Sequence, residues 1–178
     1  KDILNIISNT KPNLTLDLPH NTILVKEYNK IYIQKKNKLI NNNEYKILFK
    51  DNIVIDNIKF VIVDKENKDG NEICRLNTKD IKLPLYIRNR KDGDYIILKG
   101  SNKKKKIKEI FIEKKLPKST RNTYPLLVDS EDNIIWIPNI KKSKFCIKKD
   151  EKEKNYDIII RCEWKRGKLW IKKKWKEV

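Results

Sequence analysis

Arg88 and Arg90 are the residues whose type and spacing best suit chemistry with a polyanion. Alternate side chains of a β-strand share one face, so both arginines would lie on the same face as Tyr86. Two residues along a strand span about 6.6 Å, which would bring the two guanidinium groups to neighbouring phosphates. A planar guanidinium binds phosphate oxygens in pairs. Asp92 and Asp94, across the next turn, support an equal alternative in which the arginines form an internal ion-pair cluster.

A run of lysines follows this turn. Apolar residues at i, i+3 and i+4, starting at Ile107, predict an amphipathic helix over Lys104 to Ile112. Lysines at a helix N-terminus oppose the macrodipole, so helix stability does not explain the run. Beside backbone amides, such lysines would bind phosphate, whereas a solvated charge run from codon bias is the alternative. The expected phosphate contacts are Arg88, Arg90, Lys103, Lys104, Lys105, Lys106, Lys108, Lys118 and Arg121.

Three residues in this region are expected to shape turns rather than to bind. Gly93 and Asp94 belong to a KDGD turn, which needs a residue that tolerates positive φ. Pro117 ends the predicted helix or begins a short turn at KSTRN.

The sequence shows no catalytic set and no metal site. The cysteines Cys74, Cys146 and Cys162 are scattered, with no CxxC pair, and we expect buried, reduced thiols. His20 lies in a Pro-His-Asn turn and receives no chemical role. The tryptophans lie in strand-like segments, where packing is the first expectation.

Composition favours a polyanionic partner. The chain has 178 residues, with 43 Lys plus Arg against 24 Asp plus Glu, a formal net charge of +19. Codon bias accounts for abundant lysine better than for this imbalance, and so large a charge attracts polyanions. No apolar run is long enough to span a membrane, and no signal peptide is visible, so we expect a cytoplasmic location. The chain starts with Lys and contains no Met, which suggests a fragment of a longer protein.

The elements that must position these residues are mostly short strands. Period-two segments separated by turns run from Leu14 to Leu76 and again after Leu83, with the one basic helix inserted between strands. A hairpin is expected around SEDN, and another in the Trp-rich tail at Gly167. The fold class is α+β, β-rich with short antiparallel strands. We expect the end of a preceding helix at 1–11, a β-rich segment at 12–82 and a binding domain at 83–178, the last two packing as one unit or as two.

One ordered set of residues resembles a pattern in the C-terminal region of bacterial tRNA(Ile)-lysidine synthetases. The set consists of Arg88, Arg90, Gly93, Asp94, Lys105, Lys106, Lys108, Pro117, Arg121, Pro125 and Trp136. The resemblance extends back through Leu18-Pro19 and Tyr28 and forward to about Phe145. Lys91 departs from it where a proline is common, and Asn139 where a glycine is common. The Trp-rich tail lies beyond the similar region.

This resemblance implies a fold like a domain of the phenylalanyl-tRNA synthetase β chain. It implies a full-length ligase that uses ATP, with Mg, to join lysine to the wobble cytidine of the isoleucine tRNA with a CAU anticodon. The ATP-pyrophosphatase domain of the family would precede this chain, which would itself bind no cofactor and contact the tRNA acceptor stem. Two alternatives remain: a general nucleic-acid-binding module, and a structural or homodimer-forming domain whose basicity reflects codon bias.

Overall fold

The computed structural model describes residues 2–35, 44–55, 57–151 and 155–164. Its elements, in chain order, are α1 (Asp2–Ser8), β1 (Asn13–Leu18), β2 (Thr22–Glu27), β3 (Lys30–Lys35), β4 (Lys46–Leu48), β5 (Ile53–Ile55), β6 (Ile58–Ile62), β7 (Ile73–Leu76), the 3-10 turn η1 (Thr78–Asp80), β8 (Tyr86–Arg88), β9 (Tyr95–Ile97), β10 (Lys104–Lys106), α2 (Ile107–Glu113), α3 (Lys118–Arg121), β11 (Leu126–Val128), β12 (Ile134–Ile137), β13 (Lys141–Lys142) and β14 (Ile158–Trp164). None of the helices within these ranges is long and apolar enough to cross a bilayer.

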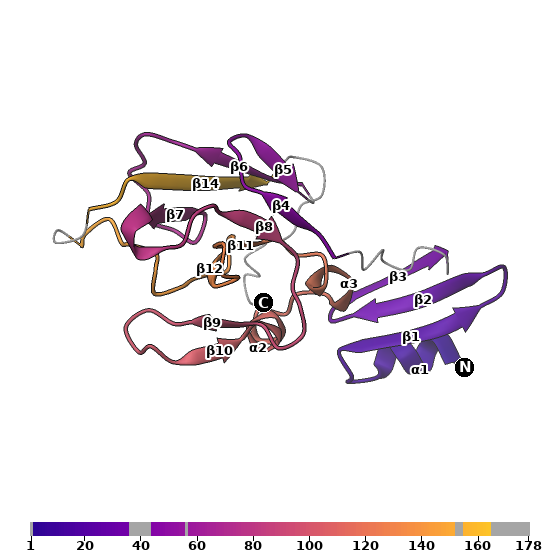
Figure 1. Cartoon of the computed structure of the whole chain (residues 1–178). Helices are drawn as coiled ribbons and strands as arrows, with labels where there is room; N and C mark the ends of the chain where they lie inside the picture. The colour runs from indigo at the N-terminus through magenta and orange to yellow at the C-terminus, as the bar shows by residue number, and fades with distance from the viewer. Residues whose placement is uncertain (1, 36–43, 56, 152–154, 165–178) are drawn as a thin grey trace.

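The first unit is a three-stranded antiparallel sheet with α1 packed against one face (Figure 1). Strand β2 is central, and Leu24 and Val25, which point to opposite faces, are both buried. The ammonium group of Lys26 donates to the carbonyl oxygens of Ile6, Ile7 and Asn9. A cation at the last carbonyls of a helix satisfies unpaired acceptors and complements the macrodipole, so Lys26 fixes α1 to its sheet.

The larger unit has three layers (Figure 1). One layer is the four-stranded sheet β5-β6-β14-β7, and the middle layer is the five-stranded sheet β13-β12-β11-β8-β4. The third consists of the β9–β10 hairpin and α2, shown at the bottom of Figure 1. Every strand pair in the described residues is antiparallel, which confirms the predicted β-rich α+β class.

A continuous apolar core joins the layers. Trp136 of the middle sheet is fully buried and meets Phe60 of the four-stranded sheet edge to face, with ring centroids 6.1 Å apart. On the other side, Phe111 of α2 packs against Tyr124, with centroids 5.4 Å apart. Contacts between buried aromatic rings of this kind add to the free energy of area burial. The hairpin that carries the lysine run therefore rests on a packed support.

Both larger sheets combine strands from before and after residue 83. Strand β4 pairs with β8, and β14 pairs with both β6 and β7. Strands of segment 44–82 therefore pair with strands of segment 83–164 in both sheets. In the described chain, strands β1–β3 pair only with one another, so the change from one set of sheets to the next falls between β3 and β4 and not at residue 83.

The lysine run differs from its prediction as a helix. Lys104 to Lys106 form strand β10, paired with β9, and α2 begins only at Ile107. Backbone hydrogen bonds from Leu98 to Lys103 and from Ile107 to Asp94 secure this pairing. The physical reason is the pairing with β9, which satisfies the backbone of the run as a strand; most of the run then avoids the unfavourable position at the helix N-terminus. The hairpin around SEDN is as predicted, with β11 paired to β12. The one predicted at Gly167 lies outside the described residues.

Candidate nucleic-acid interface

Arg88 lies at the end of β8 and is 2% exposed. Its guanidinium group binds both carboxylate oxygens of Asp94, at 2.8 and 3.0 Å, and its Nε lies 3.3 Å from Asp132. Burial opposes the positive charge, but Asp94 and then Asp132 outweigh it and raise the pKa of Arg88. The internal ion-pair alternative therefore holds for Arg88, and its burial removes it from direct contact with a phosphate at the surface.

The KDGD turn is built around the same carboxylate. Asp94 also accepts a hydrogen bond from the backbone N–H of Lys91, at 2.8 Å. Gly93 has φ of +87°, the left-handed conformation expected of it, and no atom of the described residues lies within 4 Å of where a Cβ would be. Asp94 thus has two roles: its carboxylate orients the guanidinium group of Arg88, and it also closes the KDGD turn.

Arg90 is held next to α3. Its side chain is 15% exposed, with Nη1 3.1 Å from Asp92 and Nη2 donating to Asn122 at 3.0 Å. Asp92 is almost fully exposed, so this ion pair is open to solvent and adds little stability. Arg90 therefore joins the turn to α3, and a small part of its side chain remains exposed to solvent.

The strand conformation separates the four consecutive lysines. Lys104 and Lys106 point away from α2, while Lys105 points toward it and pairs with Glu113 at 2.7 Å. Lys104 lies over the exposed ring of Tyr95, 4.4 Å from its centroid. Lys105 is therefore partly neutralised, and the outer face of β10 carries Lys104 and Lys106.

Five of the expected contacts are exposed and have no carboxylate partner among the residues that the structure describes. These are Lys103, Lys104, Lys106, Lys108 and Lys118. Lys106 is the N-cap residue of α2, and Lys108 lies in its first turn. Lys118 begins α3 directly after the buried Pro117, whose extended backbone sets the start of that helix. We call Lys103, Lys104, Lys106, Lys108 and Lys118 the lysine surface.

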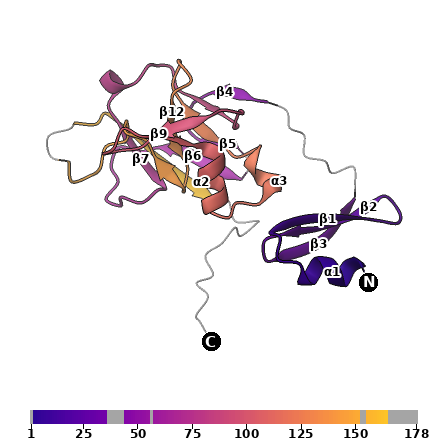
Figure 2. The ribbon, with the colours of Figure 1, turned by 90° about the horizontal axis from the view of Figure 1, so that it is seen from below.

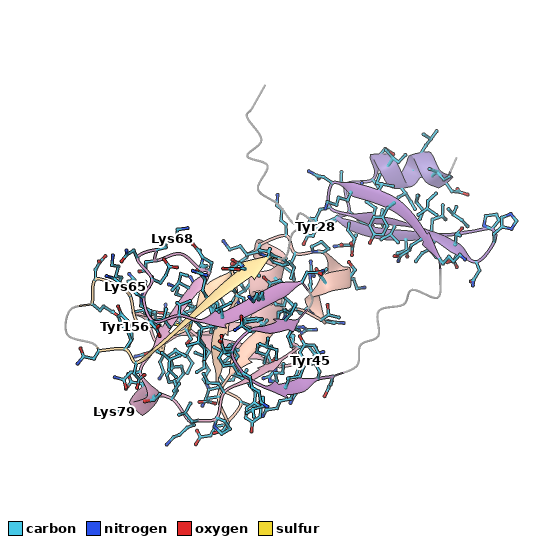
Figure 3. The ribbon with its side chains drawn as sticks, turned by 90° about the horizontal axis from the view of Figure 1, so that it is seen from above. Tyr28, Tyr45, Lys65, Lys68, Lys79 and Tyr156 are labelled. Atoms are coloured by element: carbon cyan, nitrogen blue, oxygen red, sulfur yellow. The ribbon has the colours of Figure 1, made fainter. Side chains whose placement is uncertain are left out.

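Arg121 connects α3 to the first unit. Its Nε donates to the carbonyl oxygen of Leu116 at 2.8 Å, and its Nη2 donates to the hydroxyl of Tyr28 at 2.7 Å. Beside it, the backbone N–H and hydroxyl of Ser119 donate to the buried carboxylate of Glu27, at 2.8 and 2.9 Å. Figure 3 shows Tyr28 on the side of the small unit that faces the larger one. Arg121 is therefore half-buried in a junction between the two units.

A second group of lysines was not singled out from the sequence. Lys99, Lys141, Lys142 and Lys148 line a cleft of about 380 Å³. The bridge between Leu98 and Ser143 brings their segments together, although more than forty residues separate them in sequence. Lys99 pairs with Glu151, and Lys142 pairs with Asp69. No local sequence pattern predicts this cleft, because the cleft depends on a contact between strands that are far apart in the sequence.

The cysteines are buried, as expected, and no disulfide joins them in the described part of the chain. The sulfur atoms of Cys74 and Cys146 lie 3.4 Å apart, and burial raises the pKa of Cys162 to about 12. The described residues include no group of His, Cys, Asp or Glu that could hold a metal ion.

Residues 85–164 match the family model of the TilS substrate C-terminal domain. A solved structure described as the TilS C-terminal domain is similar to this chain, with a TM-score of 0.60 and 27% identity, and covers 70% of this chain and 100% of that one. Residues 85–164 form a TilS C-terminal domain. Every expected phosphate contact falls within this TilS domain.

The tRNA(Ile)-lysidine synthase of Bacillus cereus (strain ATCC 14579) is 33% identical over 162 residues, which cover 89% of this chain and 34% of that protein. The matches span about a sixth to a third of the length of the curated relatives. An N-terminal fragment of the phenylalanyl-tRNA synthetase β-subunit from Pyrococcus horikoshii has a TM-score of 0.40 at 23% identity, covering 60% of this chain and 29% of that one. That likeness is too weak to define a shared fold.

Proposed function

We propose that this chain is the tRNA-binding C-terminal region of a tRNA(Ile)-lysidine synthase. The observation that carries the proposal is the lysine surface: exposed ammonium groups without carboxylate partners among the described residues, carried by β10 and the residue before it, α2 and α3 on a packed core. Arg88 is assigned an internal positioning role, and Lys105, Arg90 and Arg121 hold the surface in shape while contributing charge near it.

The proposed ligand is the backbone of an A-form RNA stem. The major groove of such a stem is too deep and narrow for side chains to read, so proteins contact its phosphates and 2′-hydroxyls. Lysine ammonium groups are suited to this task because they bind phosphate as point charges in many geometries. Among the parts of a tRNA, the acceptor stem is the proposed contact, by analogy with the resemblance described above.

In the whole protein, we propose that the activity is that of a ligase. It would use ATP and Mg to activate the wobble cytidine of the isoleucine tRNA with a CAU anticodon, and would then join lysine to it in the cytoplasm. The B. cereus relative is named for this synthase activity. The present chain would supply tRNA binding and no catalytic group.

The proposal is tested by removing charge from two places. Lys103→Gln, Lys106→Gln and Lys108→Gln together should weaken binding of isoleucine tRNA by at least tenfold at a fixed, stated salt concentration. The matched control is Lys65→Gln, Lys68→Gln and Lys79→Gln, which removes equal charge from exposed positions outside the lysine surface (Figure 3). Equal losses in both triple variants would show that net charge alone binds the RNA.

Competition separates the proposal from its alternatives. A tRNA-binding region should prefer isoleucine tRNA to duplex DNA of equal length, whereas a general nucleic-acid module should bind both alike. A structural or dimer-forming domain should retain no tRNA at physiological salt and should elute as a dimer in gel filtration.

A further inference from the structure

A second cavity lies beside the lysine surface and has a different character. It encloses about 240 Å³. One wall comes from β9 and the segment next to it, with Tyr95, Ile97 and Phe145. The opposite wall is the turn between β11 and β12, with Glu131, Asp132 and Asn133. The Arg88–Asp94 ion pair borders the same cavity.

The aromatic wall is placed by strand pairing. Tyr95 and Ile97 lie on the same face of β9, and the hydrogen bond from the N–H of Lys144 to the carbonyl oxygen of Ile97 positions Phe145 next to them. Tyr95 is 42% exposed, although it belongs to a strand whose next residue, Ile96, is fully buried. A half-exposed aromatic ring beside a cavity offers a flat apolar surface to a ligand.

Lysines flank both aromatic rings. Lys104 lies 4.4 Å from the centroid of Tyr95, and Lys144 lies 5.3 Å from that of Phe145. The combination of aromatic faces and nearby cations is the one that proteins use to stack unpaired bases while contacting the adjoining phosphates.

The charges of the lining decide which part of a nucleotide enters. The cavity is lined by two cationic side chains, those of Arg88 and Lys91, and by twice as many carboxylates. The carboxylates are those of Asp92, Asp94, Glu131 and Asp132. A phosphate would be repelled from this interior, whereas an uncharged base can enter it and leave its phosphate among the flanking lysines. The volume is below the range of about 300–1,000 Å³ typical of sites for drug-sized ligands, so it fits one base better than a larger ligand.

We propose that this cavity binds one unpaired nucleotide of the RNA, with its base against Tyr95 and Phe145. The inference deepens the proposed function and rests on it. A paired base cannot serve, because bases within an A-form stem are stacked and enclosed. The occupant is therefore a base at a single-stranded end or bulge next to the stem that the lysine surface contacts.

The test compares two RNA hairpins with the same stem, one blunt and one with a four-nucleotide 3′ overhang. The chain should bind the overhang hairpin about tenfold more tightly than the blunt one, the order expected for one stacked base. Tyr95→Ala should abolish this advantage and leave affinity for the blunt hairpin unchanged, and Tyr95→Phe should keep it. The matched control is Tyr156→Ala, which removes another half-exposed tyrosine, at the end of the larger unit away from α1 and β1–β3 (Figure 3).

The outcomes separate the two proposals. If the wild-type chain binds both hairpins equally well, the base site is refuted and the proposed stem binding stands. If Tyr95→Ala weakens both hairpins equally while the thermal unfolding midpoint is unchanged, Tyr95 supports general binding and the base site is again refuted. If neither hairpin binds, the proposed function itself fails, and this inference fails with it.

Discussion

Arg88 and Asp94 are joined by two ion-pair hydrogen bonds, from Nη1 to Oδ2 at 2.8 Å and from Nη2 to Oδ1 at 3.0 Å. The pair lies below the surface, between the middle sheet and the β9–β10 hairpin (Figure 2 shows β9 and α2 over this side of the sheet). It therefore fixes the hairpin whose outer face carries Lys104 and Lys106.

Arg88→Ala should destabilise the fold and leave the affinity of the folded protein for tRNA nearly unchanged. Removing one partner of a buried ion pair leaves an uncompensated charge and costs about 3–5 kcal/mol. Urea denaturation followed by circular dichroism measures the loss, and filter binding under folding conditions measures affinity. Arg90→Ala is the control, because its ion-pair partner Asp92 is exposed; losing that pair and the hydrogen bond to Asn122 should cost about 1–2 kcal/mol, less than Arg88→Ala. An Arg88→Ala protein of normal stability with weakened tRNA binding would restore the phosphate-contact interpretation.

Asp132 gives stability a dependence on pH. Partial burial opposes its ionisation, but hydrogen bonds from Lys46 and Lys91 and the charge of Arg88 outweigh burial and lower its pKa to about 2. Because the folded-state pKa lies below the ordinary value, the stabilisation is complete above about pH 4 and is lost as the pH falls toward 2.

Asp132→Asn should therefore be less stable than wild type at pH 7, and the difference should narrow from pH 4 to pH 2. Chemical denaturation at pH 7, 4, 3 and 2 measures it. Asp92→Asn, at an almost fully exposed position, should show a much smaller change. A wild-type advantage that stays constant down to pH 2 would contradict the assigned ionisation of Asp132.

Glu27 is the main anchor between the two units, so Glu27→Ala should loosen them. The carboxylate is buried and accepts from Ser119 twice and from the hydroxyl of Tyr32 at 2.9 Å. Hydrogen bonds to a charged group contribute about 1.5–3 kcal/mol each. Hydrogen exchange should show faster exchange of the Ser119 amide and of β1–β3. Glu113→Ala, which breaks only the pair with Lys105, is the control. Unchanged exchange in Glu27→Ala would mean that other contacts hold the units together.

The thiol of Cys162 should resist alkylation in the native protein. It is buried, and burial raises its pKa to about 12, so the reactive thiolate is scarce at neutral pH. Iodoacetamide labelling followed by mass spectrometry should modify Cys162 only after urea is added. Rapid modification without urea would show that β14 opens readily.

Local chemistry was sufficient to predict some features of this fold. The KDGD turn required positive φ at Gly93, and the residue adopts it. Alternation predicted a strand at Tyr86 to Arg88, which forms β8, although Arg90 lies beyond the end of that strand. These features depend on a few neighbouring residues, which the sequence displays directly.

Long-range pairing decided the rest. The buried charge of Arg88 is balanced in part by Asp132, which lies 44 residues away in the turn between β11 and β12. The apolar spacing around Ile107 correctly indicated a helix, but Lys104 to Lys106 pair with β9, and this pairing sets where the helix begins. The contact of Arg121 with Tyr28 likewise joins segments that no local pattern connects.

The most direct measurement for the central claim is the salt dependence of isoleucine tRNA binding by the wild-type chain and by the lysine-surface triple variant Lys103→Gln, Lys106→Gln and Lys108→Gln. Each duplex phosphate contact contributes about 0.9 to the slope of log affinity against log salt concentration. The slope should fall by about two to three in this variant and stay unchanged in the Lys65, Lys68 and Lys79 control. Equal slopes for all three proteins would contradict the claim that the lysine surface holds the RNA backbone.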